Sequence, residues 1–226
     1  MDSSARTTSD RPQALLFDMD GLLLDTERLA MEAFVEATEP FDLPDPAGIF
    51  LTLVGSSGAQ TRARIAEVFG PSVDIAVFSQ RWDGGFHERM QQHVPVKSGV
   101  RETLAELAGR GWTMSVVTSS STVPARAILD RAGLLEHFRD VVGGDCVTAH
   151  KPDPAPYLLG AERCGVVATA CHAFEDSDKG VAAAAAAGCA VSQIPDLRPP
   201  DAPLPNLGQG VFPSLAEAVT AAGLLD

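Results

Sequence analysis

The chain has 226 residues, of which 17 are Lys or Arg and 30 are Asp or Glu, so its formal net charge is −13. Such a charge repels the phosphates of nucleic acids and anionic lipids, and we expect neither a nucleic-acid nor a membrane partner. No apolar run approaches the roughly 20 residues of a membrane-spanning helix. Residues 1–11 are polar and lack the features of a signal peptide. We therefore expect a disordered tail at 1–11 and a cytoplasmic location.

The first predicted elements are a buried strand and a run of helices. The apolar run 14–17 reads as a strand that ends in a loop at Asp18-Met19-Asp20-Gly21. Helical patterning follows from Arg28 to about His93. It comprises predicted helices at 27–37, 59–69 and 75–92, with a proline-rich break at 40–46.

From Lys97 onward, predicted strands and helices alternate. The helices are expected at 100–110, 123–132, 155–163 and 181–187, and the strands at 114–117, 141–142, up to 174 and at 190–194. A proline-rich surface loop is predicted at 195–205. Four cysteines form no C-x-x-C pair, and we interpret them as buried thiols rather than as metal ligands or nucleophiles: Cys146, Cys164, Cys171 and Cys189.

This alternation predicts an α/β fold, a doubly wound parallel sheet with helices on both faces. The helical stretch at 28–96 has no place in that pattern, so we interpret it as an inserted second domain that forms a lid over the end of the first strand. The α/β core would then comprise residues 12–27 and 97–226. Ligands of such sheets bind at the carboxyl ends of the strands.

Two carboxylates follow the first predicted strand. Asp18 and Asp20 are separated by one residue, and Gly21 allows the backbone to turn away after them. One carboxylate of such a pair can attack as a nucleophile while the other acts as an acid and then as a base. A structural turn is the alternative interpretation. A calcium loop is disfavoured, because leucines follow the glycine where further oxygen ligands would be needed.

A second acidic cluster, Glu175 and Asp176, follows another predicted strand and should reach the same edge of the sheet. Four carboxylates at one edge repel each other unless a hard cation lies between them, and Mg²⁺ is the natural candidate. The alternative role for Asp176 is to cap the helix that follows.

Two further motifs suit phosphate. The stretch Thr118-Ser119-Ser120-Ser121 offers hydroxyls and backbone N–H groups before a helix, as an anion cradle would, although such clusters also serve as caps. Lys151 directly precedes Pro152 in a loop made rigid by its prolines, where its ammonium would be fixed; a solvated surface lysine is the alternative. Together with the acids, these groups predict phosphoryl transfer. The absence of a G-x-x-x-x-G-K sequence argues against a nucleoside triphosphatase.

From Leu15 to about Ile194, the chain resembles the haloacid dehalogenase superfamily, because all four motifs of that superfamily occur in the same order. The sites that carry the resemblance are Phe17-Asp18-Met19-Asp20-Gly21, Val116-Val117-Thr118-Ser119, Lys151-Pro152-Asp153-Pro154 and Phe174-Glu175-Asp176-Ser177-Asp178-Lys179-Gly180. The resemblance implies a Rossmann-like core with a helical cap that selects the substrate.

The resemblance also implies roles for these residues. Asp18 would attack phosphorus and form an aspartyl-phosphate, and Asp20 would protonate the leaving oxygen and then activate water. Phosphate would be held by Thr118, Ser119 and Lys151. The implied Mg²⁺ ligands are Asp18, the main-chain carbonyl of Asp20, and Asp176 with Glu175 beside it.

Within the superfamily, residues 22–27 resemble the β-phosphoglucomutase branch and related small-metabolite phosphatases. The mutases carry a hinge histidine where this chain has Ala30, and this difference favours water as the phosphoryl acceptor. The cap would contact substrate through Gly55, Ser56, Gln60 and Arg62.

The function predicted from the sequence is therefore a Mg²⁺-dependent phosphatase of small phosphate monoesters such as sugar, nucleoside or polyol phosphates. The alternatives are a β-phosphoglucomutase-type sugar phosphomutase and a non-enzymatic phospho-receiver or binding protein. The only partner expected is a small phosphorylated metabolite, and the chain itself is expected to be a monomer or a weak dimer.

Overall fold

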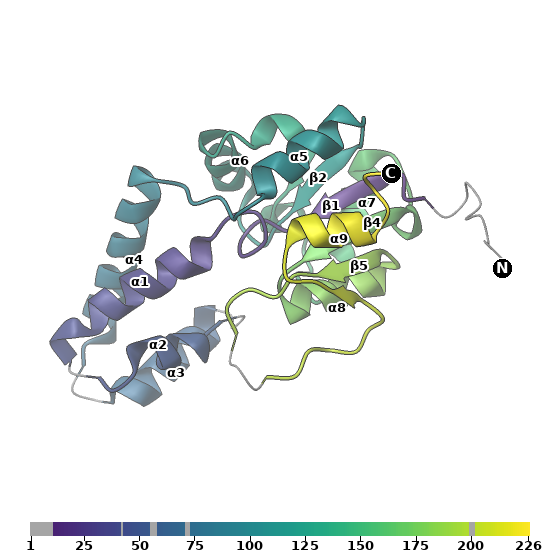
Figure 1. Ribbon diagram of the computed structural model, residues 1–226. Coiled ribbons are helices and arrows are strands. Elements are labelled where there is room, and N and C mark those ends of the chain that lie inside the picture. The colour runs from purple at the N-terminus through teal and green to yellow at the C-terminus, as the bar shows by residue number, and fades with distance from the viewer. Residues whose placement is uncertain (1–10, 42, 55–57, 71–72, 199–201) are drawn as a thin grey trace.

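A computed structural model describes residues 11–41, 43–54, 58–70, 73–198 and 202–226 of the chain. For residues 58–60 it describes the backbone alone. The centre of the fold is a parallel sheet of six strands in the order β3-β2-β1-β4-β5-β6 (Figure 1). The strands are β1 (Ala14–Phe17), β2 (Met114–Val117), β3 (Asp140–Val142), β4 (Cys171–Glu175), β5 (Ala190–Gln193) and β6 (Gly210–Val211).

Helices cover both faces of the sheet, because successive side chains of its strands point to opposite sides. Leu15 and Phe17 belong to one hydrophobic core, and Leu16 belongs to the other. The first core is closed by α5 (Val100–Gly109), α6 (Thr122–Arg131) and α9 (Leu215–Ala221). The second is closed by α7 (Ala155–Cys164) and α8 (Asp178–Ala187). The predicted doubly wound sheet is confirmed.

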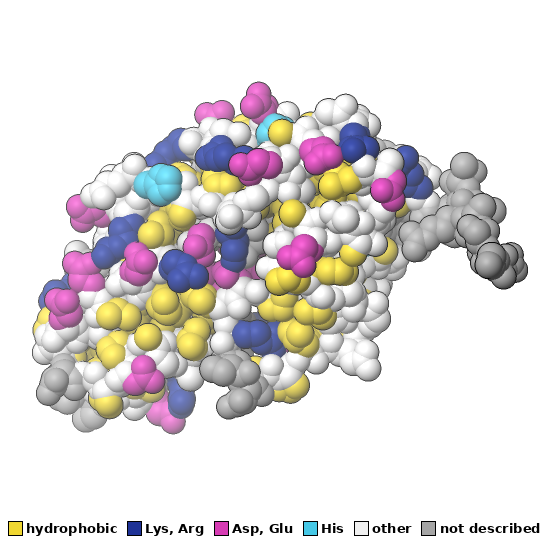
Figure 2. All heavy atoms as spheres, viewed as in Figure 1, with side chains coloured by type: hydrophobic (Ala, Val, Ile, Leu, Met, Phe, Trp, Pro, Cys, Tyr) yellow, Lys and Arg dark blue, Asp and Glu magenta, His cyan; other side chains and the backbone are white. Residues whose placement is uncertain are grey.

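The stretch between β1 and α5 forms a separate group of helices, which we call the helical unit. Figure 1 shows it, purple to blue, beside the sheet. Its members are α1 (Thr26–Thr38), α2 (Pro46–Leu51), α3 (Gly58–Phe69) and α4 (Ile75–Gln92). They enclose a hydrophobic cluster of their own, which includes Phe34, Phe50 and Phe78. In Figure 2, acidic and basic side chains are mixed over this face, and hydrophobic side chains are visible on both the helical unit and the core.

The two chain segments that join the helical unit to the core lie side by side. The backbone N–H of Asp25 donates to the carbonyl of Pro95, and that of Lys97 donates to the carbonyl of Leu23, both at 3.0 Å. Leu24 and Val96 form an antiparallel bridge between these bonds. The helical unit is therefore attached through two paired strands of chain.

Among the α-helices and strands of the described residues, three were not predicted from the sequence. Helix α2 begins at the end of the predicted proline-rich break, because Pro46 suits a first helical position and the Asp45 side chain accepts from the N–H of Gly48. Strand β6 has only two residues, and it forms by pairing with residues of β5 that lie far from it in the sequence. Helix α9 is capped by Ser214, whose hydroxyl accepts from the N–H of Glu217.

The structure also describes parts of the predicted tail and proline-rich loop, and the four cysteines. The predicted tail lies outside the described residues except for Arg11, whose guanidinium lies over the ring of Trp112 at 4.7 Å. The predicted loop at 195–205 has no helix or strand among its described residues. All four cysteines are free thiols, and three of them are buried. No helix in the described part of the chain combines the length and apolar character needed to cross a membrane.

Candidate active site

The polar residues predicted at strand ends meet at the edge of the sheet where the strand order reverses. After β1 the chain adds β2 and β3 on one side and then returns to place β4 on the other. Asp18 directly follows β1, Thr118 follows β2, and Glu175 ends β4. The N–H of Asp18 still donates to the carbonyl of Phe174, at 3.0 Å, so the two carboxylate clusters are in register. This is the position at which open α/β sheets bind ligands.

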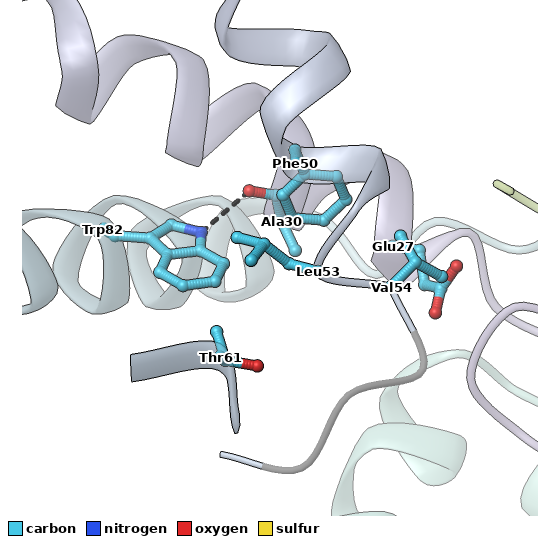
Figure 3. A pocket seen from close by; sticks show the side chains of 7 residues that line it. All are labelled: Glu27, Ala30, Phe50, Leu53, Val54, Thr61 and Trp82. Atoms are coloured by element: carbon cyan, nitrogen blue, oxygen red, sulfur yellow. Dashed lines mark hydrogen bonds between the residues drawn. The ribbon is translucent and has the colours of Figure 1, made fainter. Parts of the chain in front are cut away.

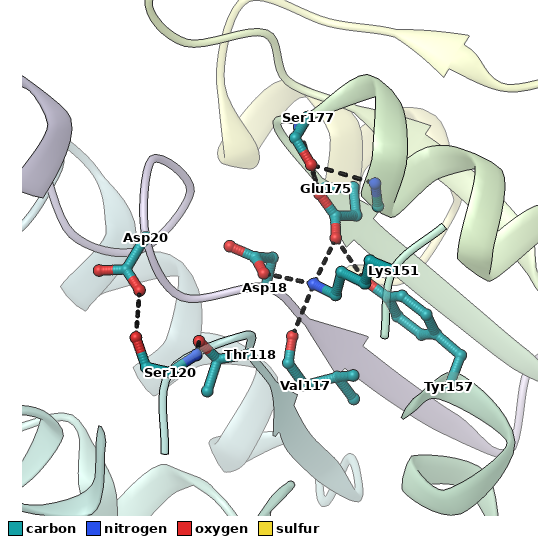
Figure 4. A network of polar contacts seen from close by, with 10 residues as sticks. Asp18, Asp20, Val117, Thr118, Ser120, Lys151, Tyr157, Glu175 and Ser177 are labelled. Atoms are coloured by element: carbon teal, nitrogen blue, oxygen red, sulfur yellow. Dashed lines mark hydrogen bonds and ion pairs between the residues drawn. The ribbon is translucent and has the colours of Figure 1, made fainter. Parts of the chain in front are cut away.

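Lys151 lies at the centre of the site (Figure 4). Its side chain is only 6% exposed, and its ammonium donates to Asp18 Oδ1 at 2.5 Å, to Glu175 Oε1 at 2.6 Å and to the carbonyl of Val117 at 2.9 Å. An ammonium has three N–H donors, and all three are used. The two carboxylates hold the pKa of Lys151 above its ordinary value in spite of burial, so the lysine stays charged. It is not a solvated surface residue.

Glu175 is held by donors at both of its oxygens. Oε1 accepts from Lys151 and, at 2.7 Å, from the hydroxyl of the fully buried Tyr157. Oε2 accepts from the backbone N–H and the hydroxyl of Ser177, at 3.2 Å and 3.1 Å. Figure 4 shows Tyr157 and Ser177 on opposite sides of the carboxylate. Glu175 therefore positions Lys151 within the site.

Asp20 lies two residues after Asp18 in the loop after β1, and it makes no hydrogen bond to Lys151 among those of the described residues. Its oxygens accept from the hydroxyl of Thr26 at 2.8 Å and from that of Ser120 at 3.1 Å. Burial raises the pKa of Asp20, and these two hydrogen bonds oppose the rise. A raised pKa favours the protonated form that a general acid needs.

The acidic residues at the edge carry more negative charge than Lys151 neutralises. Ligand atoms of Asp18, Glu175 and Asp176 lie within 4.8 Å of one another. Burial and the neighbouring carboxylates raise the pKa of Asp176 well above its ordinary value, and burial raises that of Asp18 although Lys151 opposes it. A hard divalent cation would relieve this repulsion, and an all-oxygen donor set suits Mg²⁺. The residues present therefore fit the predicted metal.

A cavity of about 620 Å³ opens over these groups. Besides the acids and Lys151, its lining includes Thr118 and Ser119, the residues expected from the sequence to hold phosphate. The Thr118 hydroxyl accepts from the N–H of Ser120 at 3.1 Å, and Thr118 is buried while Ser119 is exposed. The hydroxyl and N–H groups after β2 thus line the same cavity as the acidic cluster.

Gly21 brings the backbone of the loop after β1 close to this cluster. Its φ of 85° is in the region that favours glycine, and a Cβ there would lie 2.4 Å from Asp176 Oδ2 and 3.4 Å from Asp196 Oδ2. A side chain at this position would therefore strain the backbone and displace the Asp176 carboxylate. Asp196, from the loop after β5, lies beside the predicted metal ligands.

Several sequence predictions about this region have separate outcomes. Gly55 and Ser56 lie outside the described residues, as does the side chain of Gln60. Arg62 is exposed on α3 and is not among the described residues that line the two cavities of this region. The cap of α8 is Ser177, whose hydroxyl accepts from the N–H of Gly180 at 3.1 Å. Asp176 is therefore not needed as a cap, and that alternative is wrong.

Sequence reasoning gave no role to four polar residues that the fold brings to the site. Tyr157 is the sole tyrosine of the chain and follows Lys151 by six positions, which was a usable signal. Thr26, Glu27 and Asp196 gave no local signal, because their partners lie on other elements. Burial, Asp196 and Asp20 together raise the pKa of Glu27 to about 7.

Comparison with known proteins gives a consistent result. The model of a family described as haloacid dehalogenase-like hydrolase matches residues 15–194. The chain is 34% identical to fructose-1-phosphate phosphatase of Escherichia coli, over 79% of this chain and 94% of that protein. It is 31% identical to phosphoglycolate phosphatase of Rhodospirillum rubrum, over 80% of this chain and 78% of that protein.

Two solved structures share the whole fold. One is a haloacid dehalogenase family hydrolase from Deinococcus radiodurans, whose crystal structure contains bound phosphate and sodium. It is 27% identical to this chain, has a TM-score of 0.78, and the match covers 96% of this chain and 98% of that chain. A putative β-phosphoglucomutase from Thermotoga maritima is 27% identical with a TM-score of 0.74, covering 93% and 98%. The sheet and the helical unit are thus both present in known relatives.

Proposed function

The chain belongs to the haloacid dehalogenase-like hydrolase family and is a phosphoric monoester hydrolase, and we propose that it hydrolyses small sugar, nucleoside or polyol phosphates through a phosphoryl group carried on Asp18. The observation that carries the proposal is the meeting of Asp18, Lys151 and Asp176 at one edge, with Asp20 separate from them. Relatives named as sugar-phosphate and phosphoglycolate phosphatases support the same chemistry.

In the proposed first step, an Asp18 carboxylate oxygen attacks phosphorus and the ester P–O bond breaks. Lys151 fixes Oδ1 of Asp18 and leaves Oδ2 as the oxygen that attacks. Asp20 donates its proton to the departing alkoxide, so the leaving group departs as an alcohol. Thr118 and the N–H groups after β2 bind phosphate oxygens as their negative charge shifts.

In the proposed second step, Asp20, now a carboxylate, takes a proton from water, and the resulting hydroxide attacks the phosphorus. The bond to Asp18 breaks and inorganic phosphate is released. Asp18, Asp176 and the main-chain carbonyl of Asp20 would hold Mg²⁺, with Glu175 beside them. When bound, Mg²⁺ supplies positive charge that orients the phosphate and stabilises the transition state.

We further propose that the helical unit, at residues 28–96, is the cap that selects the leaving group. It is attached through two adjacent segments, and Glu27 at its base lines the catalytic cavity. Closure of such a unit excludes water and buries the leaving group. Ala30 has no ionisable group, so the helical unit offers no proton donor there for a mutase.

The test is phosphate release from a panel of sugar, nucleoside and polyol phosphates, with Mg²⁺ and with EDTA. We expect metal-dependent release by the wild type and a loss of at least about 10³-fold in Asp18→Asn, because an amide is a poor nucleophile. Asp20→Asn should form at most a slowly hydrolysed aspartyl-phosphate, which mass spectrometry detects.

Three outcomes would contradict this proposal. Near wild-type turnover by Asp18→Asn would refute the nucleophile assignment. Conversion of β-glucose 1-phosphate to glucose 6-phosphate without phosphate release would support the mutase instead. No turnover of any ester by the folded protein would favour a binding protein.

A further inference from the structure

Two adjoining cavities define the space in front of the nucleophile, and Glu27 and Val54 line both. The larger one contains the phosphate chemistry described above. The smaller one, of about 180 Å³, lies within the helical unit, and its other walls are Ala30, Phe50, Leu53, Thr61 and Trp82. Figure 3 shows the Glu27 carboxylate at the end of this group, pointing away from Trp82. A leaving group that extends from Asp18 into the helical unit therefore passes Glu27.

Two carboxylate oxygens of the larger cavity have no hydrogen-bond partner. Among the described residues, three buried side-chain oxygens lack one, and two of these line this cavity: Glu27 Oε2 and Asp196 Oδ2. The Asp196 side chain is only 7% exposed. A buried acceptor without a donor is unfavourable, and a ligand that supplies the donor recovers that free energy.

Asp196 is held in place from behind. Its other oxygen, Oδ1, accepts from the ammonium of Lys97, which lies on the segment that returns from the helical unit to the core. The next residue, Leu197, packs against the hydrophobic cluster of the helical unit. The unpaired oxygen of Asp196 is therefore fixed at the boundary between core and helical unit, on the same cavity as Glu27.

The cations of the cavity do not balance these acids. Its lining contains three cationic side chains, Lys151, Lys179 and Arg198, and six carboxylates: Asp18, Asp20, Glu27, Asp176, Asp178 and Asp196. Lys151 uses its three donors on the protein. Arg198 donates to Asp178 and to the carbonyls of Ala202 and Pro203. The unpaired acceptors that face the leaving group, on Glu27 and Asp196, are both carboxylate oxygens.

We propose that Glu27 and Asp196 select phosphate esters whose leaving group carries hydroxyls and reject those whose leaving group carries a carboxylate. A hydroxyl donates a proton to the unpaired oxygens, whereas a carboxylate brings only acceptors and a like charge. The inference rests on the proposed function and narrows it. It separates this chain from a phosphoglycolate phosphatase, whose leaving group, glycolate, carries a carboxylate.

The experiment compares two esters with the same carbon skeleton, glycerol 3-phosphate and 3-phosphoglycerate, which differ by a terminal CH₂OH or carboxylate. The assays are run at alkaline pH, above the raised pKa of Glu27, so that its carboxyl is ionised. We expect the wild type to favour glycerol 3-phosphate by at least about tenfold in kcat/KM. In Glu27→Gln and in Asp196→Asn this ratio should fall by about tenfold, because the amide removes a charge and adds a donor.

Glu32→Gln is the matched control, because Glu32 is an exposed carboxylate on the same helix as Glu27. Its ratio should equal that of the wild type. The wild-type ratio requires no substitution and tests the inference even where a variant does not fold.

Several results would overturn the inference. One is a wild-type ratio at or below one. Another is an equal loss for both esters in the two variants; a raised Mg²⁺ requirement in Asp196→Asn would then assign Asp196 to the metal. Absence of phosphate release from every ester would instead refute the proposed function, and this inference with it.

Discussion

The edge of the sheet and the interior of the helical unit hold their side chains in opposite ways. At the edge, buried charges are fixed by directed bonds, and Lys151 bonds Asp18 after β1, Val117 of β2 and Glu175 of β4. In the helical unit, Phe34 packs edge-to-face against Phe50, Phe69, Phe78 and Trp82, with ring centroids 5.1–6.4 Å apart. The chemistry needs atoms at fixed positions, whereas a cap needs only a stable shape that can move as a body.

The largest expected effect is a loss of stability in the helical unit that leaves the stability of the sheet region nearly unchanged. Phe34 is fully buried, and Phe34→Ala should lower the free energy of unfolding of the helical unit by about 3–5 kcal/mol. The chain has two tryptophans, Trp82 in the helical unit and Trp112 against the core of the sheet. Urea unfolding followed by tryptophan fluorescence therefore reports each region once the other tryptophan is changed to Phe.

We expect Phe34→Ala to shift the transition reported by Trp82 to lower urea and to leave that reported by Trp112 nearly in place. Phe34→Leu, which keeps most of the volume, is the control and should have a smaller effect. An equal shift of both transitions would show that the two regions unfold as one cooperative unit.

A second prediction concerns the other end of β4, where His172 lies half-buried against Phe174 and bonds the Ser192 hydroxyl at 2.9 Å. Burial lowers the pKa of His172 to about 4. The unfolded chain binds the proton more readily, so this stability is present above a pH of about 6.5 and is lost as the pH falls towards about 4.

Between about pH 7 and about pH 5, the loss from His172 should be about 2 kcal/mol. In His172→Gln, the acid-induced loss of stability should be smaller by that amount. Urea unfolding reported by Trp112 at the two pH values measures it. Identical pH dependence in both proteins would show that His172 takes up no proton on unfolding.

The smallest expected effect concerns the hydrogen bond from Tyr157 that helps to hold Glu175, and through it Lys151, at the edge of the sheet. Tyr157→Phe removes the hydroxyl that donates to Glu175 and keeps the ring, whose centroid lies 5.2 Å from the Lys151 ammonium. One lost hydrogen bond of roughly 1 kcal/mol should lower kcat/KM by about fivefold through a less rigidly held Lys151. Steady-state kinetics measure the change. An unchanged kcat/KM would mean that Lys151 and Ser177 hold Glu175 without Tyr157.

Much of the fold was predictable from local pattern. The predicted helix at 75–92 and strand at 114–117 are confirmed at both ends, as Ile75–Gln92 and Met114–Val117. Asp74 caps that helix, accepting from two backbone N–H groups, and a strand buried on both faces is a plain apolar run. Helix α2 and the elements after the proline-rich loop were missed, because their signals are short or depend on distant partners.

The sequence by itself determined which residues could perform the chemistry, since carboxylates, hydroxyls and a lysine directly follow or lie between predicted strands. Parallel strands bring such positions to one edge regardless of detail. Only the tertiary structure decided how they are used. It gave all three Lys151 donors to the protein and left Glu27 and Asp196 with unpaired oxygens. Those outcomes depend on contacts between residues far apart in the chain, and no local pattern encodes them.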